Sequence, residues 1–403
     1  MYGLVLEGGG ARGSYHMGAY KAIKAEGLEI GAIAGTSIGA INGAMIVQGD
    51  FERALELWQD ISYSMVIDAN DEEIKRLKNK KLDRNDLRLL SDKLKAVIND
   101  RGFDITPLKE LLNQYIDEDR IRASNMDFGL VTVNLSDLKS IEIFKEDIPK
   151  GEMKDYILAS AYLPAFKSEK LKGKRFLDGA FYDNLPFTML KKRGYKDLIL
   201  VRTHARGITR KINPDMDPIV VTPSDDIGQT FEFEHERAKR NIELGYYDAL
   251  RAIRGLKGRK YYIEPIGEDF AFNLLITLNS EQLTSLGKII KTHNIPHLRE
   301  LLEYIVPKLG SQMGLSKTFT YEDFIISLLE KKAESLNINR FQIYKYNELL
   351  ELAKCTPSNR NERLSEYSTL GKLIDKVDLS AIFNKEETIL NLANIILCKY
   401  NIV

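Results

Sequence analysis

Two short apolar segments near the start of the chain, with a helix-like stretch between them, constrain the fold more than any other feature. Residues 3–6 and 30–34 have the length and apolar character of buried strands, and residues 14–25 and 38–47 have the character of helices. Two strands joined by a helix within about 35 residues form a β-α-β unit, in which the strands are parallel. We therefore expect an α/β protein with a mainly parallel central sheet.

Further strand-like segments follow, and the pattern changes after Pro265. The sequence predicts strands at residues 128–133, 141–144, 175–177, 198–201 and 219–221, helices at 108–115 and 156–162, a long helix at 227–254 and a closing strand at 261–263. Beyond Pro265, apolar residues recur at helical spacing, as in Tyr321, Phe324, Ile325 and Leu328. We expect one domain at residues 1–268 and a helical C-terminal extension at residues 269–403, whose role the sequence does not indicate.

The overall charge and the cysteines limit the class of protein. Basic and acidic residues both number 58, which argues against a nucleic-acid partner. Cys355 and Cys398 have no metal or redox spacing, so we expect free thiols in a reducing cytoplasm, and neither a metal nor a cofactor. The start of the chain, Met1 to Glu7, is typical of a strand and not of a signal peptide. Peripheral membrane contact and homo-oligomer formation stay open.

A glycine-rich run follows the first strand. It consists of Gly8, Gly9, Gly10, Ala11, Arg12 and Gly13. Such a run suits a turn whose N–H groups face an anion at the start of a helix. A dinucleotide site would also need an acidic residue at the C-terminal end of the second strand. Glu29 lies at the start of that strand, the wrong end of the sheet, so the sequence disfavours the dinucleotide interpretation.

A G-x-S-x-G motif follows the second strand. It consists of Gly35, Thr36, Ser37, Ile38 and Gly39. In a nucleophile elbow the serine occupies a sharp strand-to-helix turn that exposes its Oγ, and the flanking glycines leave room for that turn. The helix that follows adds a favourable dipole for a developing oxyanion. The alternative is a small-residue helix that packs on a sheet, with Ser37 merely capping it.

The third motif is Asp178, Gly179 and Ala180, directly after the short strand at 175–177. An Asp-Gly pair at a strand end is often only a turn. Together with an anion-binding loop and an elbow serine on one parallel sheet, however, this carboxylate completes a hydrolase constellation of nucleophile, base and oxyanion hole.

In this order the three motifs are similar to those of the patatin-like phospholipases. The resemblance covers about residues 1–264 and includes segments 159–166 and 183–186 on either side of the aspartate. It implies a three-layer α/β fold, distinct from the α/β hydrolases, and a Ser37–Asp178 dyad that cleaves ester bonds of phospholipids, lysophospholipids or other acyl lipids. Glu7 stands where plant members have Asp, which puts nothing catalytic in doubt.

The resemblance and the motifs together suggest a role for each residue. Ser37 attacks the ester, and Asp178 accepts its proton and later activates water. The loop from Gly8 to Gly13 holds the oxyanion, with the N–H groups around Gly9, Gly10 and Ala11 as the best candidates. For Arg12, a contact with lipid phosphate and a structural salt bridge are both open.

Three alternatives stay open at this stage. His204 follows the strand at 198–201 and could complete a Ser-Asp-His triad. The chain could instead be a non-catalytic lipid- or nucleotide-sensing protein on the same fold. It could also transfer the acyl group to an acceptor other than water.

Overall fold

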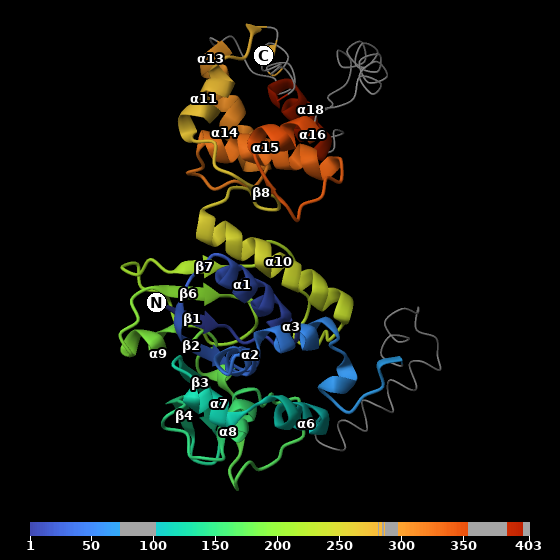
Figure 1. Cartoon of the computed structure of the whole chain (residues 1–403). Helices are drawn as coiled ribbons and strands as arrows, with labels where there is room; N and C mark the ends of the chain where they lie inside the picture. Colours follow the sequence, from blue (N-terminus) through green and yellow to red (C-terminus); the bar gives the residue numbers. More distant parts are fainter. Residues whose placement is uncertain (73–101, 281, 284–285, 287–296, 354–384, 398–403) are drawn as a thin grey trace. The chain divides into compact units, whose positions relative to one another are not determined.

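The computed structural model describes residues 1–72, 102–280, 282–283, 286, 297–353 and 385–397. The chain forms two compact units, Met1–Arg254 and Gly255–Val403 (Figure 1). The sequence placed a boundary near residue 268, and the structure places it at Gly255. The two differ because β8 (Tyr262–Ile263), the expected closing strand, pairs with β9 (Ile343–Tyr344) in the second unit. Cys355 and Cys398 lie outside the described residues.

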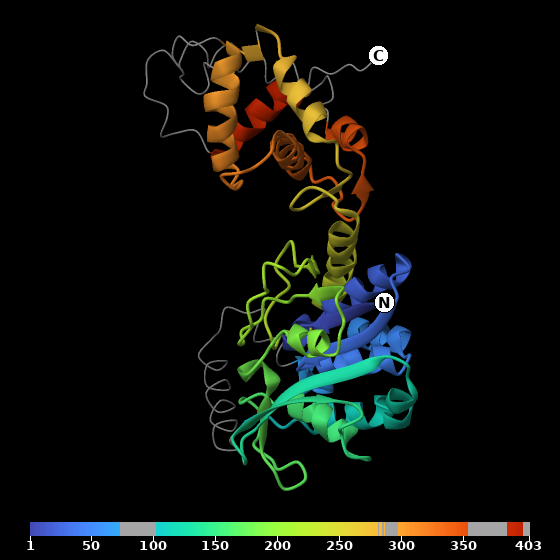
Figure 2. The same cartoon turned by 90° about the vertical axis from the view of Figure 1, so that its left-hand side faces the viewer.

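The first unit is built on a twisted, mainly parallel sheet. Its strands are β1 (Tyr2–Leu6), β2 (Ile30–Thr36), β3 (Asp127–Asn134), β4 (Lys139–Phe144), β5 (Phe176–Asp178), β6 (Leu198–Val201) and β7 (Ile219–Val221). They lie in the order β4-β3-β2-β1-β6-β7, and β5 also pairs with β3. All pairs are parallel except those of β3 with β4 and with β5. The β3–β4 hairpin is the long teal ribbon of Figure 2.

Helices cover both faces of this sheet. They are α1 (Ser14–Ala25), α2 (Ile38–Val47), α3 (Phe51–Gln59), α6 (Thr106–Tyr115), α7 (Glu118–Ala123), α8 (Met153–Ser160), α9 (Phe187–Lys192) and α10 (His235–Arg254), with 3-10 turns η1 (Gly10–Gly13), η2 (Tyr63–Met65) and η3 (Gly179–Phe181). On one face, Met189 and Leu190 of α9 pack on alternate strand residues such as Val5. On the other, α2 packs on β1 and β2, and α1 packs on α10. This arrangement confirms the predicted fold class.

One predicted helix begins later than its sequence pattern indicated. The pattern extends a helix over residues 227–254, but α10 begins at His235. Gly228 has φ 83°, which is a left-handed conformation that no helix contains. Residues 227–233 therefore form a loop, and their aromatic side chains are free to line the active site instead of a helix face.

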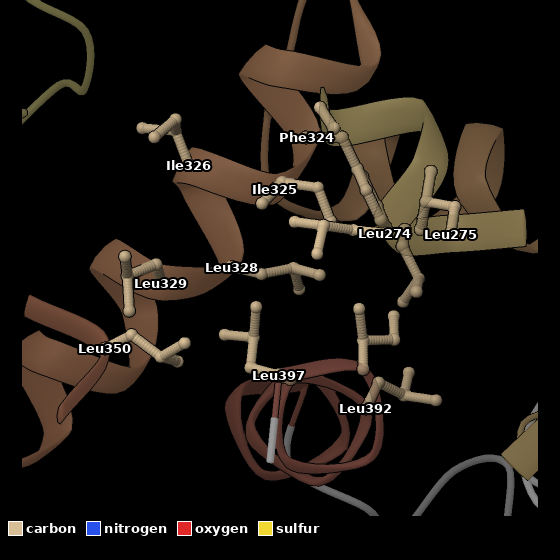
Figure 3. Close-up of a cluster of buried hydrophobic side chains, with 14 of the residues drawn as sticks. Leu274, Leu275, Phe324, Ile325, Ile326, Leu328, Leu329, Leu350, Leu392 and Leu397 are labelled. Atoms are coloured by element: carbon tan, nitrogen blue, oxygen red, sulfur yellow. The ribbon is translucent and has the colours of Figure 1, made fainter. Parts of the chain in front are cut away.

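The second unit is mainly helical. It contains α11 (Glu268–Ile276), α13 (His297–Glu300), a π-helical turn η4 (Leu301–Ile305), α14 (Val306–Gln312), α15 (Tyr321–Ser335), α16 (Tyr346–Ala353) and α18 (Lys385–Leu397), besides β8 and β9. Leucines and isoleucines of α11, α15, α16 and α18 converge in one core (Figure 3). Glu330 in α15 accepts hydrogen bonds of 2.8 Å from the N–H groups of Arg259, Lys260 and Tyr261, which fixes the chain's entry into this unit.

Within the described part of the chain, no helix has both the length and the apolar character that crossing a membrane requires.

Candidate active site

The register of β3 brings Ser37 and Asp178 together. One side of β3 is occupied by β4, so β2 and β5 share the other side. The last pair between β2 and β3 is Thr36 with Val131, and the first pair between β5 and β3 is Asp178 with the next residue, Thr132. Because consecutive strand residues rise about 3.3 Å, the residue after Thr36 lies beside Asp178.

Ser37 occupies the strained turn that the elbow motif predicts. Its backbone has φ 56° and ψ −125°, and α2 begins at the next residue. A non-glycine residue in such a region costs about 1–3 kcal/mol and persists only where the surroundings fix it. Here the Ser160 Oγ accepts a 2.9 Å hydrogen bond from the Ser37 N–H, and the Thr36 hydroxyl donates one of 2.7 Å to the Asp183 carbonyl. These two hydrogen bonds fix the backbone at Thr36 and at Ser37, where the turn is strained.

Asp178 has the surroundings of a base. Its side chain is fully buried, and Oδ1 accepts a 2.8 Å hydrogen bond from the Ala180 N–H. Burial raises the pKa of Asp178 to about 6, opposed by interaction with the Ser37 hydroxyl and the Ala180 N–H. Its second oxygen, Oδ2, has no partner of full hydrogen-bond geometry among the described residues. The contact with Ser37 is therefore loose, as is common in enzymes without bound substrate.

The glycine loop leaves fewer N–H groups available to an oxyanion than the sequence indicated. The Gly8 N–H donates to the Asn184 carbonyl at 3.1 Å, and the Ala11 N–H donates to the Thr230 carbonyl at 2.8 Å. Both groups are occupied in stabilising the loop. The N–H groups of Gly9 and Gly10 have no backbone partner among the described residues, and Gly10 lines the same cavity as Ser37. Of the predicted loop residues, these two are best placed for an oxyanion.

Arg12 ties the glycine loop to neighbouring loops through backbone carbonyls. Its guanidinium donates to three backbone carbonyls, those of Gly228 at 2.8 Å, Thr203 at 3.1 Å and His204 at 2.9 Å. These bonds tie the glycine loop to the loops after β6 and β7. Three of its five N–H donors are committed in this way, so Arg12 positions the loop.

His204 lies on the other side of Ser37 from Asp178. Its ring Nε2 is 2.5 Å from Thr222 Oγ1, directly after β7, and its N–H donates to the Glu7 carboxylate at 2.9 Å. In the sheet order, β1 and β6 separate β2 from β7, while Asp178 sits beside β3. Strands are about 4.8 Å apart, so the His204 ring faces away from the dyad.

An apolar cavity opens at Ser37. It encloses about 890 Å³ of space, which includes the open solvent at its mouth. Its walls come from α2, α3, α6 and the loop before α10, and include Met45, Trp58, Leu112, Phe166, Phe231 and Phe233. Such a lining suits a hydrocarbon chain and offers a charged group few polar partners.

Sequence reasoning missed two residues that support this site. Ser160 lies in one of the segments that resemble the family, but nothing in its spacing shows that it binds the nucleophile's N–H. Asn184 is fully buried beside Gly8, and its amide atoms have no partner among the described residues. Buried amides are normally hydrogen-bonded, so this one is available to a bound ester or a water molecule.

Comparisons with known proteins find similarity to one family in particular. A family model described as Patatin-like phospholipase matches residues 4–191. A patatin-like phospholipase domain-containing protein of Caenorhabditis elegans is 27% identical over 199 residues, which cover 49% of this chain and 16% of the relative. Patatin-like phospholipase domain-containing protein 6 of Homo sapiens is 22% identical over 290 residues, which cover 65% of this chain and 18% of the relative.

A shorter stretch has a higher sequence identity to another relative. Neuropathy target esterase sws of Drosophila persimilis is 56% identical over 43 residues, which are 11% of this chain and 3% of the relative. The matched part therefore spans less than a fifth of the length of each of these curated relatives. Among solved structures, VipD from Legionella pneumophila aligns over 99% of this chain and 92% of its own, with 13% identity and a TM-score of 0.41.

Proposed function

Given that residues 4–191 belong to the patatin-like phospholipase family, we propose that this chain is a serine acyl hydrolase that cleaves carboxylic esters of phospholipids or lysophospholipids through Ser37 and Asp178. One observation carries the proposal: a nucleophile elbow opens into an apolar cavity and lies beside a buried carboxylate whose pKa is raised.

The chemistry runs through an acyl-enzyme. Ser37 Oγ bonds to the ester carbonyl carbon while its proton passes to Asp178, and the carbonyl oxygen becomes an oxyanion near the N–H groups of Gly9 and Gly10. When this intermediate collapses, the C–O bond breaks and the leaving alcohol takes the proton from Asp178. Water then attacks the acyl group, gives its proton to Asp178, and releases the fatty acid as Ser37 regains a proton.

The cavity supports the choice of substrate class. A long acyl chain in contact with Met45, Leu112 and Phe233 leaves water, and each buried CH₂ contributes about 0.8 kcal/mol. The head group remains toward solvent because the cavity lining offers it few polar partners. A panel of phospholipids and lysophospholipids, with products identified by mass spectrometry, tests this choice and separates hydrolysis from acyl transfer. Substrate that binds unchanged would indicate a sensing role.

A fluorophosphonate probe is expected to label the wild-type protein at Ser37. The elbow makes this the activated serine, so Ser37→Ala should reduce labelling to background. Ser168→Ala, which removes an exposed serine, is the matched control and should label like the wild type. Gel fluorescence with mass-spectrometric identification of the labelled peptide measures both. Labelling of Ser37→Ala at the wild-type level would refute the proposal.

The labelling rate is expected to rise with pH, with a midpoint near 6. Only ionised Asp178 can accept the serine proton, and its pKa is raised to about 6 by burial. Below the midpoint the rate should fall about tenfold per pH unit, because the fraction of ionised base falls by that factor. Stopped labelling reactions between pH 4.5 and 8 measure the profile.

Asp183 provides the control for this profile, because burial also raises its pKa to about 6. Its carboxylate faces Arg210 Nε at 3.0 Å and is outside the proposed proton path. Asp183→Asn should therefore keep the midpoint, provided that the variant folds as judged by circular dichroism. If the midpoint disappears in Asp183→Asn, the group that controls labelling is Asp183 and not Asp178.

A further inference from the structure

A basic hairpin connects the wall of the acyl cavity to the proposed base. Phe166 lines the cavity, Asp178 ends β5, and residues 167–175 between them carry five basic side chains and one acidic side chain. The hairpin turns at Lys172 and Gly173, which have φ 49° and 79°, and is closed by the pair Leu171 and Lys174. This local excess of positive charge contrasts with the neutral chain as a whole.

Three of these cations have no ion-pair partner among the described residues. Lys172 approaches Asp155 at 3.9 Å, Lys174 pairs with Asp137 at 2.9 Å, and Glu169 pairs with Lys109. The remaining side chains, those of Lys167, Lys170 and Arg175, extend from exposed positions of the hairpin. An anionic partner would complement them.

Exposed apolar side chains accompany this charge. Leu135 and Leu138, in the turn between β3 and β4, are 42% and 85% exposed. The turn is bonded to the hairpin, since the Leu135 N–H donates to the Arg175 carbonyl at 2.9 Å. Phe181 and Ile208 beside the Asp178 motif are 50% and 57% exposed, and the Ile208 N–H donates to the Ala180 carbonyl at 2.8 Å. All four lie at the end of the sheet where β2 ends and Ser37 follows.

Exposed apolar side chains next to lysines without an ion-pair partner among the described residues match the two attractions of an anionic bilayer, which are apolar and electrostatic. Apolar side chains insert between acyl chains, and each Lys or Arg near an anionic surface raises the partition constant about fivefold. Nucleic acid would use the charge but would leave the leucines in water. We propose that the hairpin 167–175 and the turn 135–138 form a docking surface for an anionic phospholipid bilayer, which presents the mouth of the acyl cavity to lipid. The biological role of this surface rests on the proposed function, but vesicle binding can be measured without ester hydrolysis.

The test is co-flotation of the full chain with vesicles, in a Ser37→Ala background that prevents hydrolysis. Vesicles of phosphatidylcholine alone are compared with vesicles that contain phosphatidylserine. We expect binding to the anionic vesicles, and a loss of about tenfold or more in partitioning for Lys170→Glu/Arg175→Glu and for Leu138→Asp. Lys191→Glu/Lys196→Glu is the matched control. Both lysines are exposed and form no ion pair within the described residues. Lys196 precedes β6 and so lies at the opposite end of the strands.

Several results would overturn the docking surface. These are wild-type partitioning in the hairpin variant, an equal loss in the Lys191/Lys196 control, or binding to short duplex DNA without binding to vesicles. A soluble short-chain ester, tested with Ser37 intact, separates this proposal from the proposed function. The hairpin variants should hydrolyse it within about twofold of the wild type, because the hairpin is outside the reacting groups. If the wild type binds vesicles but hydrolyses no ester, the function fails and the docking surface stands.

Discussion

Asp178→Asn is expected to lower ester turnover by roughly 100-fold or more, the scale of lost general-base catalysis. Asparagine keeps the shape of the side chain and can still accept the Ala180 N–H, but it cannot take the proton of Ser37. The loss should appear in kcat and not in KM, because the acyl cavity is unchanged. Steady-state kinetics on a soluble ester measure it.

His204→Gln is the comparison for this variant. The ring faces Thr222, beyond β6 and β1 from the nucleophile, so its replacement should cost less than about tenfold in turnover. Equal losses in two folded variants would make His204 part of the machinery and refute the dyad. A loss in His204→Gln alone would reduce Asp178 to a turn residue.

The stability of Asp178→Asn tests independently whether this carboxylate is catalytic or structural. The pKa of Asp178 is raised in the folded protein, so between about pH 4 and 6 the folded state binds more protons than the unfolded state. The free energy of unfolding therefore falls as pH rises through this window, by roughly 3 kcal/mol for a shift of this size. Asparagine removes this cost, so Asp178→Asn should be inactive but at least as stable as the wild type at pH 8 in urea unfolding. Loss of both activity and stability would mean that the carboxylate is structural.

The three motifs could be identified from the sequence because each one spans only a few consecutive residues. Three glycines in succession, or a serine flanked by glycines at a strand end, define a backbone conformation within a few residues. The helices at 14–25 and 38–47 and the strands at 198–201 and 219–221 have the bounds that the sequence predicted. In these segments the local pattern and the tertiary packing favour the same structure.

What the sequence could not predict depends on register and on loops. The place of Asp178 beside Ser37 follows from β2 and β5 each pairing with the same side of β3, which brings together residues about 140 positions apart in the chain. Phe231 and Phe233 fit a helical pattern as well as a cavity wall, and only the left-handed Gly228 keeps them out of α10. The hydrogen bond from the Ser37 N–H to Ser160 likewise joins residues that no motif connects.

Gly39→Ala is expected to reduce turnover and fluorophosphonate labelling by roughly 100-fold, although the change adds one methyl group. A Cβ at this position would lie 2.2 Å from the backbone oxygen of Leu6, so α2 and β1 would have to separate. No side-chain rotation can relieve a clash with backbone, and overpacking of this kind costs about 1–3 kcal/mol. Because Ser37 immediately precedes α2, the shift moves the nucleophile, and a displacement of about 1 Å can cost 100-fold in rate.

Gly43→Ala, one turn along the same helix, separates the position of the methyl group from its mere presence. A Cβ there would lie 3.0 Å from Ile33 Cγ2 and 3.3 Å from Phe128 Cε2, both side-chain atoms that can move by a few tenths of an ångström. Alanine also favours the helix by about 1 kcal/mol over glycine, so we expect stability within about 1 kcal/mol of the wild type and nearly full labelling. Thermal unfolding and labelling of both variants decide the matter. If Gly39→Ala labels as well as Gly43→Ala, the close approach of α2 to β1 does not position Ser37, and the elbow must be held by Ser160 and Thr36 alone.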